Sequence, residues 1–128
     1  MVKTDDKKKS SKVLIVEDST LYRQLLNNAL HEQFPKIEIE EATDGKDALV
    51  KAETFRPDLI FMDIELPEEN GLSVSKKIKI RYPATKIIIL TSYDLPEFRE
   101  ASRECADYYF SKDLSTAEIL LNVAQSVL

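Results

Sequence analysis

Carboxylates follow two short apolar stretches of the chain, each at the point where the apolar run stops. Residues 13–16 are followed by Glu17 and Asp18, and residues 59–62 are followed by Asp63. Carboxylate oxygens are ligands that hard divalent cations prefer, and a small set that leaves room for water favours Mg²⁺ over a soft metal. If the fold brings these three carboxylates together, they repel one another, and the sequence predicts a magnesium site.

A hydroxyl and an amine follow two further apolar stretches. Residues 86–90 precede Thr91, and residues 107–110 precede Ser111 and Lys112. A hydroxyl donor and a compact ammonium suit the oxygens of a phosphoryl group bound beside a metal ion. Such a site could accept a phosphoryl group on Asp63, because the metal and Lys112 would neutralise the charge on the transferring oxygens. No nearby residue resembles a base for hydrolysis.

The apolar stretches are predicted to be strands. Residues 59–62 are too few for a helix and lie between Pro57 and Pro67, which indicates an interior strand covered on both faces. Residues 13–16 and 86–90 are interpreted in the same way, and residues 107–110 as a last short strand. Isoleucine alternates with glutamate over residues 37–40, which is typical of a half-exposed edge strand. Taken alone, Asp63 at a strand end fits a turn-capping aspartate as well as a reactive one.

Apolar residues at helical spacing predict helices between these strands, over about residues 19–30, 45–55, 71–82, 95–102 and 115–127. The apolar stripe of the first helix is expected to contain Leu21, Leu25, Leu26, Ala29 and Leu30. Strands and helices thus alternate about five times, which predicts an α/β fold. The expected architecture is a doubly wound (βα)5 three-layer sandwich with a parallel five-stranded sheet.

This architecture gives the candidate side chains a common location. The carboxyl ends of parallel strands meet at one edge of the sheet, where ligands bind in open α/β folds. All five candidate side chains are therefore expected to converge there: Glu17, Asp18, Asp63, Thr91 and Lys112.

Length and composition exclude several classes of protein. The 128 residues suffice for one domain, expected over residues 13–128 after a disordered polar tail at residues 1–12. No apolar run can cross a bilayer and no apolar signal core begins the chain, so a cytoplasmic location without a membrane contact is expected. The formal net charge of -5 argues against direct nucleic-acid binding, and two glycines cannot form a glycine-rich phosphate loop.

From about Lys12 to Leu128, the sequence resembles the receiver domain of response regulators in bacterial two-component phosphorelay systems. Four segments carry the resemblance, in this order and spacing: residues 14–19, residues 58–67 with Gly71, residues 88–92 and residues 106–112. The resemblance implies a flavodoxin-like, CheY-like fold. It also implies that Asp63 is the phosphoacceptor, that Thr91 bonds the phosphoryl group and that Lys112 pairs with it.

The resemblance further implies a metal site and a switch. Glu17 and Asp18 would hold Mg²⁺ with Asp63, Asp18 directly and Glu17 through water, and Glu65 would add its backbone carbonyl. Tyr109 would be the aromatic switch that turns inward when Thr91 moves. A shift of one residue in strand register would exchange Tyr109 with its neighbour Tyr108.

The partners implied by the resemblance are a sensor histidine kinase or phosphotransfer protein as donor and an unknown downstream protein as target. The face formed by the last two helices and the last strand would carry the signal, and a phosphorylation-dependent homodimer through it is left open. Lys112 is followed by Asp113, which resembles receivers attached to helix-turn-helix output domains. The chain is expected to be either a stand-alone receiver or a piece of a longer regulator.

Two other functions are weighed against this one. A Mg²⁺-dependent phosphatase with an aspartate nucleophile needs a second aspartate two residues after the first and a threonine or valine two further on, but Glu65 and Pro67 occupy those positions. A pseudo-receiver would be a protein-interaction module that never carries phosphate, and the complete set of site residues argues against it. We expect no enzymatic activity beyond phosphorylation and self-dephosphorylation of Asp63.

Overall fold

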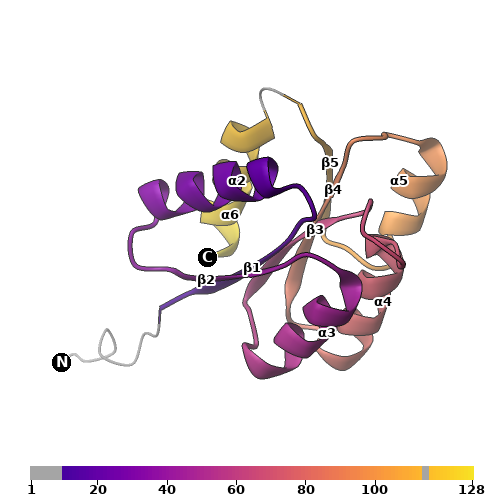
Figure 1. Ribbon diagram of the computed structural model, residues 1–128, viewed down its shortest axis with the longest axis horizontal. Helices are drawn as coiled ribbons and strands as arrows, with labels where there is room; N and C mark the ends of the chain where they lie inside the picture. Colours follow the sequence, from indigo (N-terminus) through magenta and orange to yellow (C-terminus); the bar gives the residue numbers. More distant parts are fainter. Residues whose placement is uncertain (1–9, 114–115) are drawn as a thin grey trace.

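The computed structural model describes residues 10–113 and 116–128, and a parallel sheet forms its centre (Figure 1). The sheet has the strand order β2-β1-β3-β4-β5, and every neighbouring pair is parallel. The strands are β1 (Lys12–Val16), β2 (Glu38–Ala42), β3 (Leu59–Asp63), β4 (Lys86–Thr91) and β5 (Tyr108–Ser111). The predicted five-stranded parallel sheet is confirmed.

The helices lie in two layers, one on each face of the sheet. They are α2 (Thr20–Gln33), α3 (Gly45–Thr54), α4 (Gly71–Arg81), α5 (Pro96–Ser102) and α6 (Thr116–Val127). Figure 1 shows α2 and α6 on one side of the sheet and α3, α4 and α5 on the other. This is the doubly wound three-layer sandwich that the alternation of strands and helices predicts.

Successive residues of the central strands contribute to two separate apolar cores, because side chains of a strand point alternately to the two faces. In β1, Leu14 belongs to the core under α3 and α4, whereas Val13 and Ile15 belong to the core under α2 and α6. All five residues of β3 are buried. A strand covered on both faces needs a continuous apolar run, and this explains the sequence of residues 59–62.

Two boundaries differ from the sequence-based expectation. β1 already begins at Lys12, whose backbone N–H donates to Asp58 Oδ2 over 2.8 Å, and the Ser11 carbonyl accepts a hydrogen bond from Glu38 N at 2.9 Å. The last two residues of the expected tail are therefore hydrogen-bonded to the sheet region, while residues 1–9 lie outside the described part of the chain. The edge strand β2 extends to Ala42, two residues beyond the predicted end, and Ala42 is buried.

The inward face of α2 also differs from the prediction. Leu21 and Leu25 are exposed, with 70% and 58% of their surface accessible, whereas Leu26 and Leu30 are buried. Tyr22 packs against the same core as Leu26. The helix is therefore rotated so that Tyr22, rather than Leu21, faces the sheet near the carboxyl end of β1. Within residues 10–113 and 116–128, no helix combines the length and the apolar character that a membrane span needs.

Candidate functional site

An ion triplet lies at the carboxyl edge of the sheet. Lys112 Nζ is 2.7 Å from Glu17 Oε1 and 3.2 Å from Asp63 Oδ2. Both carboxylates are 2% exposed as whole residues, and 13% of the Lys112 side chain is accessible. The structure thus brings together three of the predicted site residues, which come from the ends of β1, β3 and β5.

Continued strand pairing places two members of this triplet. Glu17 N donates to the Ala42 carbonyl at 3.0 Å, just after β1 ends, and Lys112 N donates to the Thr91 carbonyl at 2.8 Å, just after β5 ends. Both residues are thus held at the sheet edge by backbone bonds to the neighbouring strand. Asp63 is the final residue of β3 itself.

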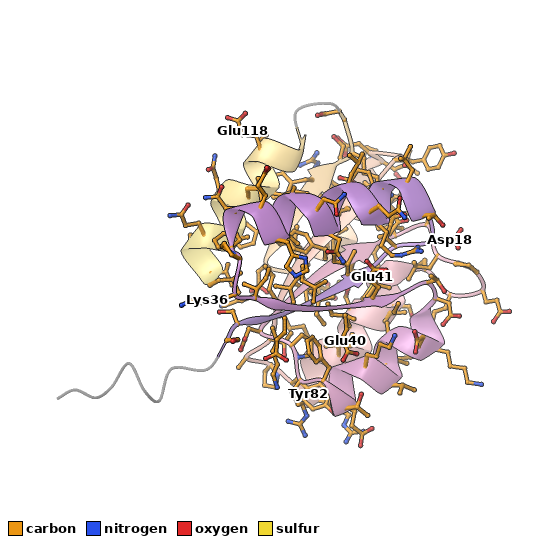
Figure 2. The ribbon with its side chains drawn as sticks, turned by 60° about the vertical axis from the view of Figure 1, so that its left-hand side comes forward. Asp18, Lys36, Glu40, Glu41, Tyr82 and Glu118 are labelled. Atoms are coloured by element: carbon orange, nitrogen blue, oxygen red, sulfur yellow. The ribbon has the colours of Figure 1, made fainter. Side chains whose placement is uncertain are left out.

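The turn from β1 into α2 is fixed by a second set of contacts. Arg23 donates to the Glu17 carbonyl over 2.8 Å and to Glu41 Oε1 over 3.0 Å, so it ties α2 to β1 and β2. The second carboxylate oxygen of Glu17 accepts the backbone N–H of Ser19 at 2.9 Å. Figure 2 shows Glu41 below α2. Glu17 is therefore held in place at both its backbone and its carboxylate.

One ammonium faces two buried carboxylates, and the remaining negative charge is not neutralised by it. Burial and the neighbouring Glu17 raise the pKa of Asp63 above its usual range, although Lys112 opposes this shift. A buried pair of carboxylates whose full ionisation is unfavourable, with oxygen donors only, fits a hard divalent cation.

Asp18 does not join the other two carboxylates. It is exposed at the start of α2, where Figure 2 labels it at the end of the helix. No three carboxylate, histidine or cysteine side chains within residues 10–113 and 116–128 are grouped closely enough to hold a metal ion. In this arrangement Asp18 lies apart from Glu17 and Asp63, because the chain turns into α2 immediately after Glu17 and leaves the next side chain in solvent. The predicted role of Asp18 as a metal ligand therefore stays a prediction.

The Thr91 hydroxyl forms hydrogen bonds with Glu65 and Tyr93 and with no member of the ion triplet. The fully buried Thr91 donates its hydroxyl proton to Glu65 Oε2 at 2.6 Å, and the same hydroxyl accepts the backbone N–H of Tyr93 at 2.9 Å. Glu65 Oε1 accepts the backbone N–H of Ser92 at 2.9 Å. The Glu65 backbone N–H in turn donates to Asp63 Oδ1 at 3.1 Å. The sequence places the acidic Glu65 side chain beside the phosphoryl site, but it did not predict this contact with Thr91.

The aromatic pair of β5 has a definite register. Tyr109 packs against the core under α3 and α4, and its hydroxyl donates to Asp94 Oδ1 at 3.0 Å. The Arg99 guanidinium lies 4.6 Å from the centre of the Tyr109 ring. Burial and the hydrogen bond to Asp94 raise the pKa of Tyr109 to about 12. Tyr108 is 37% exposed, so Tyr109 is the residue beside α5 that the sequence favoured.

Tyr22 is a site residue that the sequence analysis missed. Lys112 Nζ lies 4.6 Å from the centre of its ring. Burial, followed by the charges of Glu17 and Asp63, raises the pKa of Tyr22 to about 12. The signal that could have found it is its spacing, because Tyr22, Leu26 and Leu30 recur every four residues on one helix face.

Comparison with known proteins gives one consistent family. The sequence profile of the response regulator receiver domain matches residues 13–124. The Bacillus subtilis (strain 168) protein named uncharacterized transcriptional regulatory protein YxjL is 33% identical over 110 residues, which are 85% of this chain and 50% of that protein. A protein-glutamate methylesterase/protein-glutamine glutaminase 2 of Carboxydothermus hydrogenoformans is 37% identical over 122 residues, 91% of this chain and 34% of that protein. The chain therefore spans about half or less of the length of these curated relatives.

Solved structures agree with the sequence comparison. The chemotaxis protein CheY4 of Vibrio cholerae has a TM-score of 0.83 at 32% identity, over 94% of this chain and 100% of that one. A receiver domain protein (CheY-like) from Methanospirillum hungatei JF-1 has a TM-score of 0.83 at 27% identity, over 93% of this chain and 94% of that one.

Proposed function

Since the chain belongs to the response regulator receiver domain family, we propose that it works as a phosphorylation switch whose phosphoacceptor is Asp63. One observation carries the proposal: the buried carboxylate of Asp63 ends the central strand β3 with the Lys112 ammonium 3.2 Å away. A carboxylate can attack phosphorus, and an adjacent ammonium can balance charge on the transferring oxygens.

The transfer forms one bond and breaks another. A carboxylate oxygen of Asp63 attacks the phosphorus of a phosphohistidine or of a small acyl phosphate. The new oxygen–phosphorus bond forms as the bond to the leaving nitrogen or oxygen breaks, and the leaving atom takes the bonding electron pair. Lys112 moves from a carboxylate pair to the phosphoryl oxygens, and the Thr91 hydroxyl donates to one of them. The donor would be a sensor histidine kinase or a phosphotransfer protein.

Glu17, Asp18, Asp63 and the backbone carbonyl of Glu65 would hold Mg²⁺. Burial and the repulsion between the Glu17 and Asp63 carboxylates, which raise the pKa of Asp63, support this assignment because a cation would relieve both, and Asp18 would join when its exposed side chain turns toward them. When bound, Mg²⁺ supplies positive charge that keeps Asp63 ionised and neutralises the transferring oxygens. In its absence, the Lys112 bridge to Glu17 and Asp63 provides part of that charge.

The signal would leave the site through Thr91 and Tyr109. Phosphorylation adds about two negative charges, which is enough to bias a loop with two arrangements. A movement of Thr91 toward the phosphoryl group would open space for Tyr109, which now bonds to Asp94 beside α5. The surface of α5, β5 and α6 would then change partners, either a downstream protein, an attached output domain or a second copy of the chain.

Intact mass after incubation with Mg²⁺ and acetyl phosphate tests this function. The wild-type protein is expected to gain one phosphoryl group, Asp63→Asn none, and Asp47→Asn, on the surface of α3, the same as wild type. A protein that binds Mg²⁺ but gains no mass would be tested next with a phosphorylated histidine kinase domain. Failure with both donors and no Mg²⁺ binding would support the pseudo-receiver, whereas steady release of inorganic phosphate from a phosphoester would support a phosphatase.

A further inference from the structure

The side chain of Glu65 fills a small anion-binding arrangement at the end of β4. Two donors converge on its carboxylate: the Thr91 hydroxyl at 2.6 Å from Oε2 and the Ser92 backbone N–H at 2.9 Å from Oε1. Each carboxylate oxygen takes one donor, as in a bidentate complex. Because Thr91 is fully buried, water has little access to its hydroxyl, and the carboxylate is the acceptor in place of solvent.

The two donors have no spare proton for a second acceptor. Thr91 has one hydroxyl proton, and of its two possible acceptors Glu65 Oε2 at 2.6 Å is closer than the Tyr93 carbonyl at 3.0 Å; the Thr91 oxygen already accepts the N–H of Tyr93 at 2.9 Å. Ser92 has one backbone N–H. A phosphoryl group on Asp63 that bonds to the Thr91 hydroxyl must therefore take the donor that Glu65 now holds.

Charge repulsion keeps the Glu65 carboxylate and a phosphoryl group on Asp63 from binding the Thr91 and Ser92 donors at the same time. The backbone N–H of Glu65 bonds to Asp63 Oδ1 at 3.1 Å, so the acidic side chain starts from a residue in direct contact with the acceptor. A phosphoryl group carries about two negative charges at neutral pH, and a carboxylate on the same donors would be repelled by it.

We propose that Glu65 is a positioning residue that acts as an internal substitute for the phosphoryl group: its carboxylate holds Thr91 and Ser92 in the unphosphorylated protein and must leave when Asp63 is phosphorylated. The inference rests on the proposed function of Asp63 and deepens it. Glu65 stabilises the unphosphorylated arrangement, so it sets how readily the site is occupied and how readily Thr91 is released.

The first experiment tests the contact without any phosphoryl chemistry. An amide proton that donates to a carboxylate resonates downfield, so the ¹H–¹⁵N signal of Ser92 in the metal-free protein is expected to move upfield in Glu65→Gln and Glu65→Ala. Glu68→Gln is the matched control, because Glu68 is an exposed acidic residue of the same loop. Its substitution removes an equal charge and is expected to leave the Ser92 signal in place.

The second experiment measures the competition. Beryllofluoride with Mg²⁺ is the probe, and its dissociation constant is measured by ¹⁹F NMR for wild type, Glu65→Gln, Glu65→Ala and Glu68→Gln. Loss of a charged competitor for two hydrogen-bond donors is expected to tighten binding roughly tenfold in both Glu65 variants. Glu68→Gln is expected to bind as wild type does, within about twofold.

The outcomes separate this inference from the proposed function. Tighter binding by both Glu65 variants together with the Ser92 shift supports the inference. Equal binding by wild type and the Glu65 variants, with Asp63→Asn inactive, overturns it and leaves the phosphorylation switch standing. An unchanged Ser92 signal also overturns it, as does equal tightening in Glu68→Gln, which would show a general charge effect. If no variant binds the probe, both proposals fail.

Discussion

The ammonium of Lys112 lies against the aromatic ring of Tyr22, 4.6 Å from the ring centre. Tyr22 comes from α2 and Lys112 from the turn after β5, so the contact joins elements about ninety residues apart in the chain. The face of an aromatic ring attracts a cation, so the Tyr22 ring helps to hold the Lys112 ammonium between Glu17 and Asp63.

Removal of the Tyr22 ring should therefore slow phosphorylation of Asp63. Tyr22→Ala is expected to lower the initial rate with acetyl phosphate about fivefold, because a partly buried cation–π contact contributes about 1 kcal/mol. Tyr22→Phe retains the ring and is the matched control, with a rate close to that of wild type. Equal losses in both variants would assign the effect to the hydroxyl and contradict the cation–π role. The rates are measured by intact mass against time.

Neutralisation of Asp63 should stabilise the metal-free protein. The raised pKa of Asp63 means that the folded protein binds its proton more tightly than the unfolded chain does. The stabilisation that this proton gives the folded protein is fully present below the ordinary aspartate pKa of about 4 and is lost as the pH rises through the folded-state pKa. Asp63→Asn is expected to be more stable than wild type at pH 7 by on the order of 1 kcal/mol, with the difference vanishing near pH 4.

Urea unfolding in EDTA at several pH values measures that difference. Addition of Mg²⁺ should stabilise wild type at pH 7 and have much less effect on Asp63→Asn, which lacks one of the proposed ligands. A variant that is less stable than wild type at pH 7 in EDTA would show that the buried carboxylate pair is already fully neutralised by Lys112.

Gly71 should tolerate no side chain. A Cβ atom at this position would collide with the backbone carbonyl of Asp63, and the Gly71 N–H also donates to the Ile64 carbonyl at 2.9 Å. Gly71→Ala is therefore expected to destabilise the protein by about 3 kcal/mol or more, since backbone on both sides must shift. At Gly45, by contrast, a Cβ would lie 2.7 Å from a methyl group of Val74.

Gly45→Ala is the matched control, because it makes the same substitution at a helix start against a side chain instead of a backbone. Its expected cost is about 1–2 kcal/mol. Thermal or urea unfolding compares the two variants. A smaller loss at Gly71 than at Gly45 would contradict the close packing of α4 against the end of β3.

Asp107 should stabilise the fold through its charge. Its carboxylate is 2.8 Å from Lys79 Nζ and accepts the backbone N–H of Ile87 at 2.9 Å. Burial acts to raise the pKa of Asp107, but the bonds from Lys79 and Ile87 outweigh it and lower the pKa. Asp107→Asn is expected to cost about 1–2 kcal/mol at pH 7.

That cost should diminish in acid. The stabilisation from a lowered pKa is present above the unfolded-state value of about 4 and is lost as the pH falls through the folded-state pKa. Urea unfolding of wild type and Asp107→Asn at pH 7 and pH 3 measures the change. Glu104→Gln, an exposed site in the same connection, should match wild type at both values. An equal loss of stability in Asp107→Asn at pH 7 and pH 3 would show that the loss comes from altered packing or hydrogen bonding and not from the removed charge.

The sequence by itself determined the sheet, the order of its elements and the location of three site residues. Apolar runs such as residues 59–62 can be buried on both faces only in an interior strand, and parallel strands place their carboxyl ends at one edge. Glu17 follows one such run and Asp63 ends another, while Lys112 follows the edge strand β5, whose carboxyl end lies at the same edge of the sheet. The three residues therefore had to come together, as the structure has them.

Only the tertiary structure decided which oxygens and donors pair at that edge. Asp18 and Glu65 carry the same charge as Glu17, yet one lies in solvent and the other bonds to Thr91. Likewise, the rotation of α2 turned Tyr22 toward Lys112 in place of Leu21. Spacing along the chain fixes which face or edge a residue occupies, but the rotation of a helix and the direction of a loop side chain depend on packing and charge from elements distant in sequence.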